Sequence, residues 1–380
     1  MKIGIDARLY GQGLGLGRYV SKLIEHLELH DDTNTYTIFL RKANYDLYTP
    51  RNTRFKKVCA DVPWYSLKEQ WLLPWIFFKE RCDLLHVPHF NVPVLYPGAL
   101  IITIHDVILL KHRLSATSAA STRHPVSHWL KYMGFRVVVR IAIARASRII
   151  VVSQSVAHDL SAFFPSCKRK LRIVREAADA ISHSQPLVDP SFDPGKQFFF
   201  TAGNAYPHKN ISTLLEAVRL ASRQIPEIRL ILCGQEDFFQ KRLIQEINDR
   251  GYASIAHHVG CVSDAVLRWL YEHAVAIVLP SLEEGFGLQI VEAFVHSCPV
   301  IASRIPPYEE IGGDAVCFVD ARKAFEIAGA MQELLRDNER RCAMIQRGTV
   351  RAGMFSWNAA AHATVLVYAE SIYEAKETIV

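Results

Sequence analysis

The chain has 380 residues, of which 50% are hydrophobic and 22% are charged. This length favours two domains, and the composition is typical of a globular protein rather than a disordered one. The net charge of +6 fits anionic small substrates or an anionic membrane surface, but it is too small to indicate nucleic acid binding.

The cysteines and the N-terminus narrow the class further. The 8 cysteines lie far apart and form no Cys-x-x-Cys pair, which disfavours zinc ribbons and disulfide frameworks and predicts buried, reduced thiols. Residues 1–5 are typical of a strand rather than a signal peptide. No apolar run approaches the roughly 20 residues that a membrane span needs. These features predict a cytoplasmic protein.

Short apolar runs alternate with helical patterns in the first half of the chain. The runs at residues 2–5, 36–40, 84–87, 100–104 and 148–152 are typical of buried parallel strands. After the first run, apolar residues at positions 19, 20, 23, 24 and 27 are spaced to form one face of a helix. This alternation indicates an α/β architecture with a parallel sheet.

The second half repeats the alternation after a break. Residues 180–196 are polar and contain prolines, as an interdomain linker does. Further strands are predicted at residues 197–201, 228–233, 275–279, 299–302 and 315–319. Long helical patterns then run from about residue 323 to the end, with an interruption near residues 355–357. We therefore expect two parallel sheets, with ligands at the carboxyl ends of their strands.

The segment at residues 280–293 carries the strongest chemical signal. It follows a predicted strand and opens a helix, with Gly285 and Gly287 in the turn and Glu284 and Glu292 on either side. Glycines allow close approach to the backbone, N–H groups at a helix start bind phosphate oxygens, and carboxylates accept hydrogen bonds from sugar hydroxyls. A plain helix start, with acidic residues complementing the helix dipole, explains each feature taken alone.

Together with other motifs in the same order, this segment resembles glycosyltransferase family 4, the group 1 glycosyltransferases of the GT-B fold. Glu284 and Glu292 have the spacing of the family's E-x7-E signature, and the resemblance covers nearly the whole chain. Residues 3–8 and the glycine loop after them most resemble bacterial polysaccharide mannosyltransferases. The other matching motifs are Gly15-Leu16-Gly17-Arg18, Thr103-Ile104-His105-Asp106, Val152-Ser153-Gln154-Ser155, Gly203 with Lys209-Asn210, and Ser303 to Glu310 followed by Gly312-Gly313-Asp314-Ala315.

The resemblance implies two facing Rossmann-like domains, each a doubly wound parallel sheet. Residues 1–180 would bind the acceptor, residues 181–355 would bind a nucleotide sugar, and the helix at 356–380 would cross back to the first domain. The implied reaction transfers a hexosyl group, with retention and without a metal or cofactor, to a saccharide or lipid-linked glycan in bacterial surface polysaccharide synthesis. GDP-mannose is the favoured donor, with UDP-glucose or UDP-N-acetylglucosamine as alternatives.

The resemblance also implies roles for residues of the second domain. Glu292 matches the glutamate that accepts hydrogen bonds from the nucleotide ribose, and Glu284 matches the one near the donor hexose hydroxyls. The backbone amides of Phe286, Gly287 and Leu288 would then meet the sugar or the diphosphate.

Lys209 is the predicted counter-charge for the leaving group. A fixed ammonium stabilises the charge that develops on a nucleoside diphosphate as the glycosidic bond breaks. The family usually pairs this lysine with an arginine a few residues earlier, but here that place reads Gly203-Asn204. Asn204 donates hydrogen bonds without supplying charge. We hypothesise that Arg18 of the first domain helps to compensate.

In the first domain, His105 follows the strand at residues 100–104. The resemblance implies that it contacts the donor sugar at the reacting centre. From the residues alone, a structural histidine beside Asp106 at a strand end is the alternative. The glycine loop that includes Gly15 and Gly17 would lie near the donor phosphates and the acceptor.

Two other kinds of site find little support in the sequence. The glycine loop does not satisfy G-x-G-x-x-G in any register, and Arg41-Lys42 follows the next strand where a dinucleotide enzyme has an acidic residue. The histidine pairs at positions 86/89 and 257/258 have no evident third metal ligand nearby, and we expect the second pair at the surface or at a sheet edge.

Two stretches of the first domain have the composition of a surface that contacts the inner face of a membrane. Aromatic residues lie near two lysines, and residues 123–148 place basic side chains among apolar ones, as an interfacial helix does. An ordinary amphipathic helix packed on the sheet explains the same pattern. The aromatic residues are Trp64, Tyr65, Trp71, Trp75, Phe77 and Phe78, beside Lys68 and Lys79, and the basic residues are Arg123, Lys131, Arg136, Arg140, Arg145 and Arg148.

Three other functions stay open on the sequence alone. A nucleotide-sugar epimerase of the same fold would act on the donor without an acceptor. A phosphorylase would need a cofactor lysine, for which the sequence offers no candidate. A catalytically weak sugar-nucleotide-binding subunit is favoured by Asn204 and by Gln289, which stands where proline is common in the family.

Overall fold

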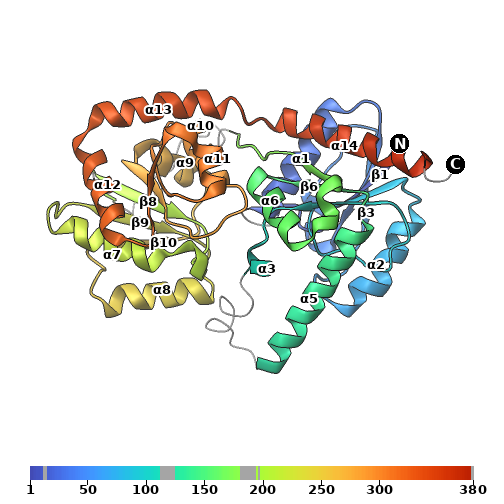
Figure 1. Ribbon diagram of the computed structural model, residues 1–380, viewed down its shortest axis with the longest axis horizontal. Helices are drawn as coiled ribbons and strands as arrows, with labels where there is room; N and C mark the ends of the chain where they lie inside the picture. The colour runs from blue at the N-terminus through green and yellow to red at the C-terminus, as the bar shows by residue number, and fades with distance from the viewer. Residues whose placement is uncertain (12–14, 112–124, 180–193, 196, 378–380) are drawn as a thin grey trace. The chain divides into compact units, whose positions relative to one another are not determined.

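The computed structural model describes residues 1–11, 15–111, 125–179, 194–195 and 197–377. These residues form two compact units (Figure 1). The first unit lies within Met1–Lys111, Ser121–Glu176 and Ser356–Val380, and the second within Ala177–Phe355. Most of the linker predicted at residues 180–196 falls outside the described part of the chain.

The first unit is built on a parallel sheet with the strand order β3-β2-β1-β4-β5-β6-β7. The central strands consist mainly of apolar residues and are buried on both faces, as expected when helices cover a parallel sheet on both sides. The strands are β1 (Lys2–Asp6), β2 (Thr35–Leu40), β3 (Phe55–Cys59), β4 (Leu84–Val87), β5 (Leu100–Ile104), β6 (Arg148–Val151) and β7 (Leu171–Ile173).

Helices connect these strands and cover the sheet. Helix α1 buries the side chains at positions 19, 20, 23, 24 and 27, which confirms the helical face predicted from their spacing. The helices of this unit are α1 (Leu16–His30), α2 (Leu67–Lys79), α3 (Ile108–Lys111), α5 (Pro125–Arg145), α6 (Gln154–Phe163) and α14 (Trp357–Glu377), with short 3-10 turns at Lys42–Leu47 and Pro165–Lys170.

The C-terminal helix α14 belongs to the first unit, although it follows the last residue of the second along the chain. It packs beside α1 (Figure 1). The Tyr368 hydroxyl lies 2.7 Å from Nδ1 of His86 in β4, and Glu370 accepts hydrogen bonds from Arg148 and Arg172. These buried and half-buried polar contacts fix α14 on the sheet.

The second unit contains another parallel sheet, with the order β10-β9-β8-β11-β12-β13. Its strands are β8 (Phe198–Ala202), β9 (Arg229–Cys233), β10 (Ala256–Gly260), β11 (Ala276–Leu279), β12 (Val300–Ser303) and β13 (Val316–Val319). Its helices are α7 (Ile211–Ser222), α8 (Phe238–Asp249), α9 (Asp264–His273), α10 (Leu288–Val295), α11 (Pro306–Gly312), α12 (Ala324–Arg336) and α13 (Asn338–Ala352), with 3-10 turns at Pro207–Lys209 and Gly313–Ala315.

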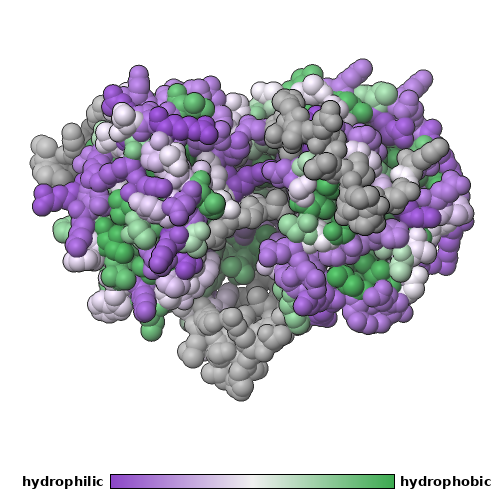
Figure 2. Space-filling view, turned by 180° about the vertical axis from the view of Figure 1, so that it is seen from behind, coloured by the Kyte–Doolittle hydropathy of each residue, from purple (hydrophilic) through white to green (hydrophobic). Residues whose placement is uncertain are grey.

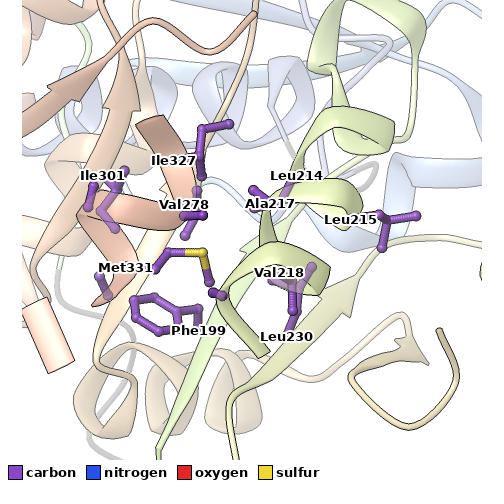
Figure 3. Close-up of a cluster of buried hydrophobic side chains, with 14 of the residues drawn as sticks. Phe199, Leu214, Leu215, Ala217, Val218, Leu230, Val278, Ile301, Ile327 and Met331 are labelled. Atoms are coloured by element: carbon purple, nitrogen blue, oxygen red, sulfur yellow. The ribbon is translucent and has the colours of Figure 1, made fainter. Parts of the chain in front are cut away.

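A hydrophobic core on one side of this second sheet joins α7 and α12 to the strands (Figure 3). Leu214 and Val218 of α7, Met331 of α12 and Phe199 of β8 are fully buried. Burying side chains of this size contributes about 1.5–3 kcal/mol each to folding before the entropy cost. The core therefore holds β8 and the start of α7, which are the elements on either side of Lys209.

All ten predicted strands are confirmed, with ends that differ by at most one residue. The structure adds three strands that the sequence reading missed, namely β3, β7 and β10. His257 and His258 lie in β10, which is an edge strand as expected. The helical pattern after residue 323 is divided at Asp337 as well as near residue 356.

The prediction of buried thiols is only partly correct. Cys167, Cys233, Cys298 and Cys317 are buried, but Cys59, Cys261 and Cys342 are exposed. Cys82 is half-buried, and burial raises the pKa of its thiol. The cysteines are free thiols.

On the face shown in Figure 2, hydrophilic residues are interspersed with small groups of hydrophobic ones.

Two of the residues predicted to face a membrane are in fact internal. Phe77 is fully buried, and Arg148 is a nearly buried residue of β6 that pairs with Glu370. Arg123 and the side chain of Lys131 lie outside the described residues. Among the helices that the structure describes, none is both long and apolar enough to cross a membrane.

Candidate active site

Glu284 lies in the loop between β11 and α10, where it accepts three hydrogen bonds on one carboxylate oxygen. Its Oε1 lies 2.5 Å from Nζ of Lys209, 2.8 Å from Oγ of Ser281 and 3.0 Å from the hydroxyl of Tyr308. The carboxylate is therefore held in one orientation by an ammonium and two hydroxyl groups. The Glu284 side chain is 15% exposed to solvent, so a ligand can reach it.

The electrostatics of this cluster favour an ionised Glu284. Burial alone would raise the pKa of its carboxyl, but the charge and hydrogen bond of Lys209 and the hydrogen bond of Ser281 bring it below the ordinary value. Burial and the neighbouring Glu284 charge raise the pKa of Tyr308 far above its usual range. Beside Lys209 the site thus contains an ionised carboxylate and a neutral phenol.

Lys209 is positioned by a short 3-10 turn, Pro207–Lys209, that precedes α7. Asn210 follows it with a left-handed backbone (φ 56°), and its side-chain amide Nδ2 donates to the carbonyls of Pro280 and Ala321 at 3.2 and 2.7 Å. The amide of Leu282 donates to the carbonyl of His208 at 2.7 Å. These bonds join the Lys209 turn to the Glu284 loop, although 75 residues separate the two side chains along the chain.

The turn at Phe286, Gly287 and Leu288 leads directly into α10. Gly287 has φ 105°, and a Cβ there would lie 2.8 Å from the ring of Tyr308, so only glycine fits without displacing that ring. Phe286 is buried against Phe355. The first amides of α10, from Leu288 onward, lie at the positive end of the helix, which favours phosphate or hydroxyl oxygens there.

Glu292 lies one turn further along α10 and is 7% exposed. The hydroxyl of Tyr271, in α9, donates to its Oε2 at 3.0 Å. A buried carboxylate needs such a partner, because an unsatisfied one costs far more than the hydrogen bond gains. Tyr271 therefore orients the carboxylate that is predicted to bind ribose.

The loop after β8 contains Gly203 and Asn204, the residues predicted near the donor phosphates. Gly203 has φ 116°, and its carbonyl accepts a hydrogen bond from Gln240 Nε2 at 2.9 Å. Gln289 Nε2 donates to the Ala202 carbonyl at 2.6 Å, so it braces the same loop from α10. Asn204 is exposed, and its side-chain oxygen accepts from the Tyr206 amide at 3.5 Å.

In the first unit, His105 follows β5 and contacts two acceptors. Its Nδ1 lies 2.7 Å from Oε1 of Glu176, and its Nε2 lies 3.2 Å from the Pro88 carbonyl. The Glu176 carboxylate and the Pro88 carbonyl therefore hold the imidazole ring from its two nitrogens. Asp106 beside it accepts from the Ile108 amide at 2.9 Å, which starts the short helix α3.

The glycine loop lies near His105 within the first unit. Gly15 precedes α1 with φ 76°, and Gly17 and Arg18 form the first turn of that helix. Tyr19, the next residue, packs its ring edge-on against the His105 imidazole with ring centroids 4.6 Å apart. Residues 12–14 of the loop lie outside the described part of the chain.

The histidines at positions 86 and 89, which the sequence analysis weighed as metal ligands, pack inside the first unit. His86 is fully buried between Tyr368 and Thr103, and burial lowers its pKa to about 3, so it is neutral. Burial also lowers the pKa of His89 to about 3, with its ring against Phe90. In the part of the chain that the structure describes, no three His, Cys, Asp or Glu side chains are grouped to hold a metal.

The structure thus brings Lys209, Glu284 and the Phe286–Leu288 turn together in the second unit, with Glu292 on the same helix. It also reveals positioning residues whose role the sequence analysis missed; all but Ser281 come from other elements. These residues are Ser281, Tyr308, Tyr271, Gln240 and Glu176.

Comparison with known proteins identifies the family. Glycosyltransferase Family 4 matches residues 15–180, and Glycosyl transferases group 1 matches residues 188–351. The two matches cover most of the chain. The protein therefore belongs to the group 1 glycosyltransferases of family 4, and it is a glycosyltransferase.

Individual relatives agree with this assignment. The chain is similar to the O-antigen chain mannosyltransferase RfbU of Salmonella typhimurium, with 23% identity over 346 residues that cover 87% of this chain and 90% of the relative. It is also similar in structure to the sucrose-phosphate synthase of Thermosynechococcus elongatus (TM-score 0.75, 19% identity, 98% and 99% of the two chains). A third likeness is to Anabaena HepE in complex with UDP and glucose (TM-score 0.72, 18% identity, 97% and 100%). These structural matches indicate the GT-B α/β fold.

Proposed function

We propose that the protein transfers a hexosyl group from a nucleotide diphosphate sugar to a saccharide or lipid-linked glycan, with retention of configuration and without a metal. The observation that carries the proposal is the contact between Lys209 and Glu284, fixed by Ser281 and Tyr308. An oriented carboxylate and an ammonium side by side match the hexose and the diphosphate of such a donor. The carboxylate accepts from hexose hydroxyls, and the ammonium counters diphosphate charge.

In this proposal the bond between the anomeric carbon and the diphosphate oxygen breaks first. The electron pair stays on the leaving diphosphate, where Lys209 and the start of α10 stabilise the negative charge. A diphosphate oxygen accepts the proton of the acceptor hydroxyl, whose oxygen bonds to the anomeric carbon on the same face. Glu284 and His105 hold the hexose during this exchange, and Glu292 holds the ribose.

A mannosyl donor is favoured within this proposal. The relative RfbU is an O-antigen chain mannosyltransferase, which supports mannose and a surface polysaccharide acceptor. The HepE structure contains UDP and glucose, which keeps UDP-sugars as an alternative to GDP-mannose. A cytoplasmic location, with peripheral contact to the inner face of the membrane, is part of the same proposal.

Lys209→Ala tests the proposal directly. Loss of a fixed ammonium that stabilises the leaving group should lower kcat by about a hundredfold or more, as removal of comparable transition-state stabilisers does. The assay measures donor turnover across GDP- and UDP-sugars, with and without an extract-derived acceptor. Near wild-type turnover of the variant would refute the role of Lys209.

Lys323→Ala is the matched control, because Lys323 also pairs with carboxylates in the second unit but on an exposed surface. It should turn over like the wild type. Product stereochemistry gives a second readout, since an inverted anomeric centre would exclude a retaining transfer. Free sugar formed equally with and without acceptor would favour the epimerase instead, and donor binding without turnover would favour the binding subunit.

A further inference from the structure

Helix α2 is apolar on two opposite faces, of which only one is covered. Leu73 and Phe77 face the interior of the first unit and are fully buried. The opposite face carries four large apolar side chains, each more than half exposed: Leu67, Trp71, Trp75 and Phe78. Contiguous exposed apolar surface of this kind marks an interaction site in soluble proteins.

The loop at residues 88–99 contacts both α2 and α5, and α5 carries a second exposed apolar stripe. The Val94 amide donates to Gln70 of α2 at 2.8 Å, and the Val94 carbonyl accepts from Arg145 of α5 at 2.7 Å. Leu95, the next residue, is 50% exposed. On α5 the exposed apolar residues recur every four positions, on one side of the helix: Trp129, Met133 and Val137.

The exposed charges on the described parts of these two helices are of one sign. Helix α2 contains one acidic residue, Glu69, which is buried and bonded to Arg8 at 2.7 Å, and the α5 sequence contains none. Lys79 places its ammonium 3.4 Å from the centroid of the exposed Trp75 ring. The other basic residues of the two helices with described side chains are Lys68, Arg136, Arg140 and Arg145.

We propose that this surface, the aromatic face, binds a lipid bilayer that contains anionic lipids. The aromatic face consists of Leu67, Trp71, Trp75, Phe78, Leu95, Trp129, Met133 and Val137. Tryptophan and phenylalanine beside lysine and arginine, with no exposed acidic residue on the described parts of α2 and α5, match both layers of an anionic membrane surface. The rings enter the interface between headgroups and acyl chains, while the cations meet the phosphates.

The same charge pattern disfavours a second copy of the chain as the occupant. Pairing two aromatic faces would bring Lys68, Lys79 and the α5 arginines of both copies together, and like charges across an interface oppose association. An anionic bilayer instead gains about fivefold in affinity for each such charge near its surface. The inference deepens the peripheral membrane contact of the proposed function and rests on that contact alone. It does not depend on the donor, the acceptor or the reaction, so failure of vesicle binding would leave the proposed transfer reaction standing.

Flotation of the purified full-length protein with vesicles tests this inference. We expect binding to vesicles of phosphatidylcholine with phosphatidylglycerol and much weaker binding to phosphatidylcholine alone. The double variant Trp71→Ser/Trp75→Ser should lose at least about tenfold in affinity, because it removes two interfacial anchors. The control Val350→Ser/Met354→Ser removes equally exposed apolar residues of the second unit and should bind like the wild type.

A charge variant separates the two contributions. Arg136→Gln/Arg140→Gln should lower affinity by about fivefold per charge at low salt and much less at high salt, while Arg223→Gln/Arg322→Gln should not. Absence of vesicle binding at low salt would overturn the proposal, as would equal losses in tested and control variants. Dimers in sedimentation velocity that disappear in Trp71→Ser/Trp75→Ser would identify a second copy as the occupant instead.

Discussion

Tyr308 shows how much of the site depends on a residue outside the donor-binding motif. Its side chain is 1% exposed, and its hydroxyl donates to Glu284 at 3.0 Å while its ring fills the space beside Gly287. The phenol therefore fixes the carboxylate and shapes the glycine turn at once. A group that orients the substrate-binding carboxylate should affect turnover without touching the substrate.

We expect Tyr308→Phe to lower kcat/KM by at least about tenfold, because a hydrogen bond to a charged group contributes about 1.5–3 kcal/mol. The fold should survive, since the ring remains. Tyr252→Phe is the matched control: this hydroxyl also donates to a carboxylate, Glu216, at 3.0 Å in the same unit but belongs to no proposed site. Equal activity of the two variants in the donor turnover assay would contradict the role of Tyr308.

At this scale the sequence predicts the groups that meet a ligand better than the groups that hold them. Glu284, Glu292 and Lys209 stand in motifs whose spacing follows from one loop and one helix. Tyr308 and Tyr271 reach the same carboxylates from α11 and α9, and no spacing in the chain links them. Glu176 likewise meets His105 only because both residues follow the carboxyl ends of parallel strands, β7 and β5, of one sheet.

The connection from α1 to β2 illustrates how one side chain organises the junction of two elements. Asp31 accepts from the amides of Thr33 and Asn34 at 2.9 and 3.2 Å and from the Asn34 side chain at 2.7 Å, and it also bonds the Tyr36 hydroxyl. Burial opposes its ionisation, but these hydrogen bonds lower the pKa of Asp31 to about 2. The ionised carboxylate therefore stabilises the folded state.

The sign of the pH effect follows from that lowered pKa. The stabilisation from Asp31 is present above the pKa of the unfolded state, near 3.8, and is lost as the pH falls through about 2. At neutral pH, Asp31→Asn should thus cost about 2 kcal/mol of unfolding free energy. Denaturant unfolding from about pH 7 to pH 3 checks this.

The difference from wild type should be constant down to about pH 4 and shrink below it, where Asp31 becomes neutral first in the unfolded chain and then, near pH 2, in the folded protein. Asp249→Asn, at an exposed position of α8, is the control and should have little effect. A difference that stays constant to the lowest pH would show that the carboxylate's charge is irrelevant to this junction.

The elements that the sequence reading missed lie at sheet edges. Strands β3, β7 and β10 are each the first or last strand of their sheet. Edge strands are often short and polar, because they face solvent and must resist pairing with another chain. β3 contains two lysines, β7 has three residues and β10 contains two histidines, so none presents the apolar run that identifies a central strand.

At the scale of the whole molecule, the predicted site residues divide between the two units. Lys209, Glu284, Glu292 and the α10 start belong to the second unit, whereas His105 and the α1 start belong to the first. Nucleotide binding should therefore depend chiefly on the second unit. Turnover should depend on both units, because the arginine expected near Lys209 is replaced by Asn204 and the first unit, through Arg18, is predicted to compensate.

We propose that Arg18 supplies the positive charge that Asn204 lacks. Arg18→Ala should then lower kcat by at least about tenfold, while the Kd of the free nucleoside diphosphate changes by less than about threefold. Asn204 is exposed, so an arginine fits at its position. Asn204→Arg introduced into the Arg18→Ala variant should restore most of the lost turnover, because it returns a cation to the diphosphate. Failure of this rescue, or an Arg18→Ala variant with unchanged kcat, would mean that Lys209 alone counters the leaving group.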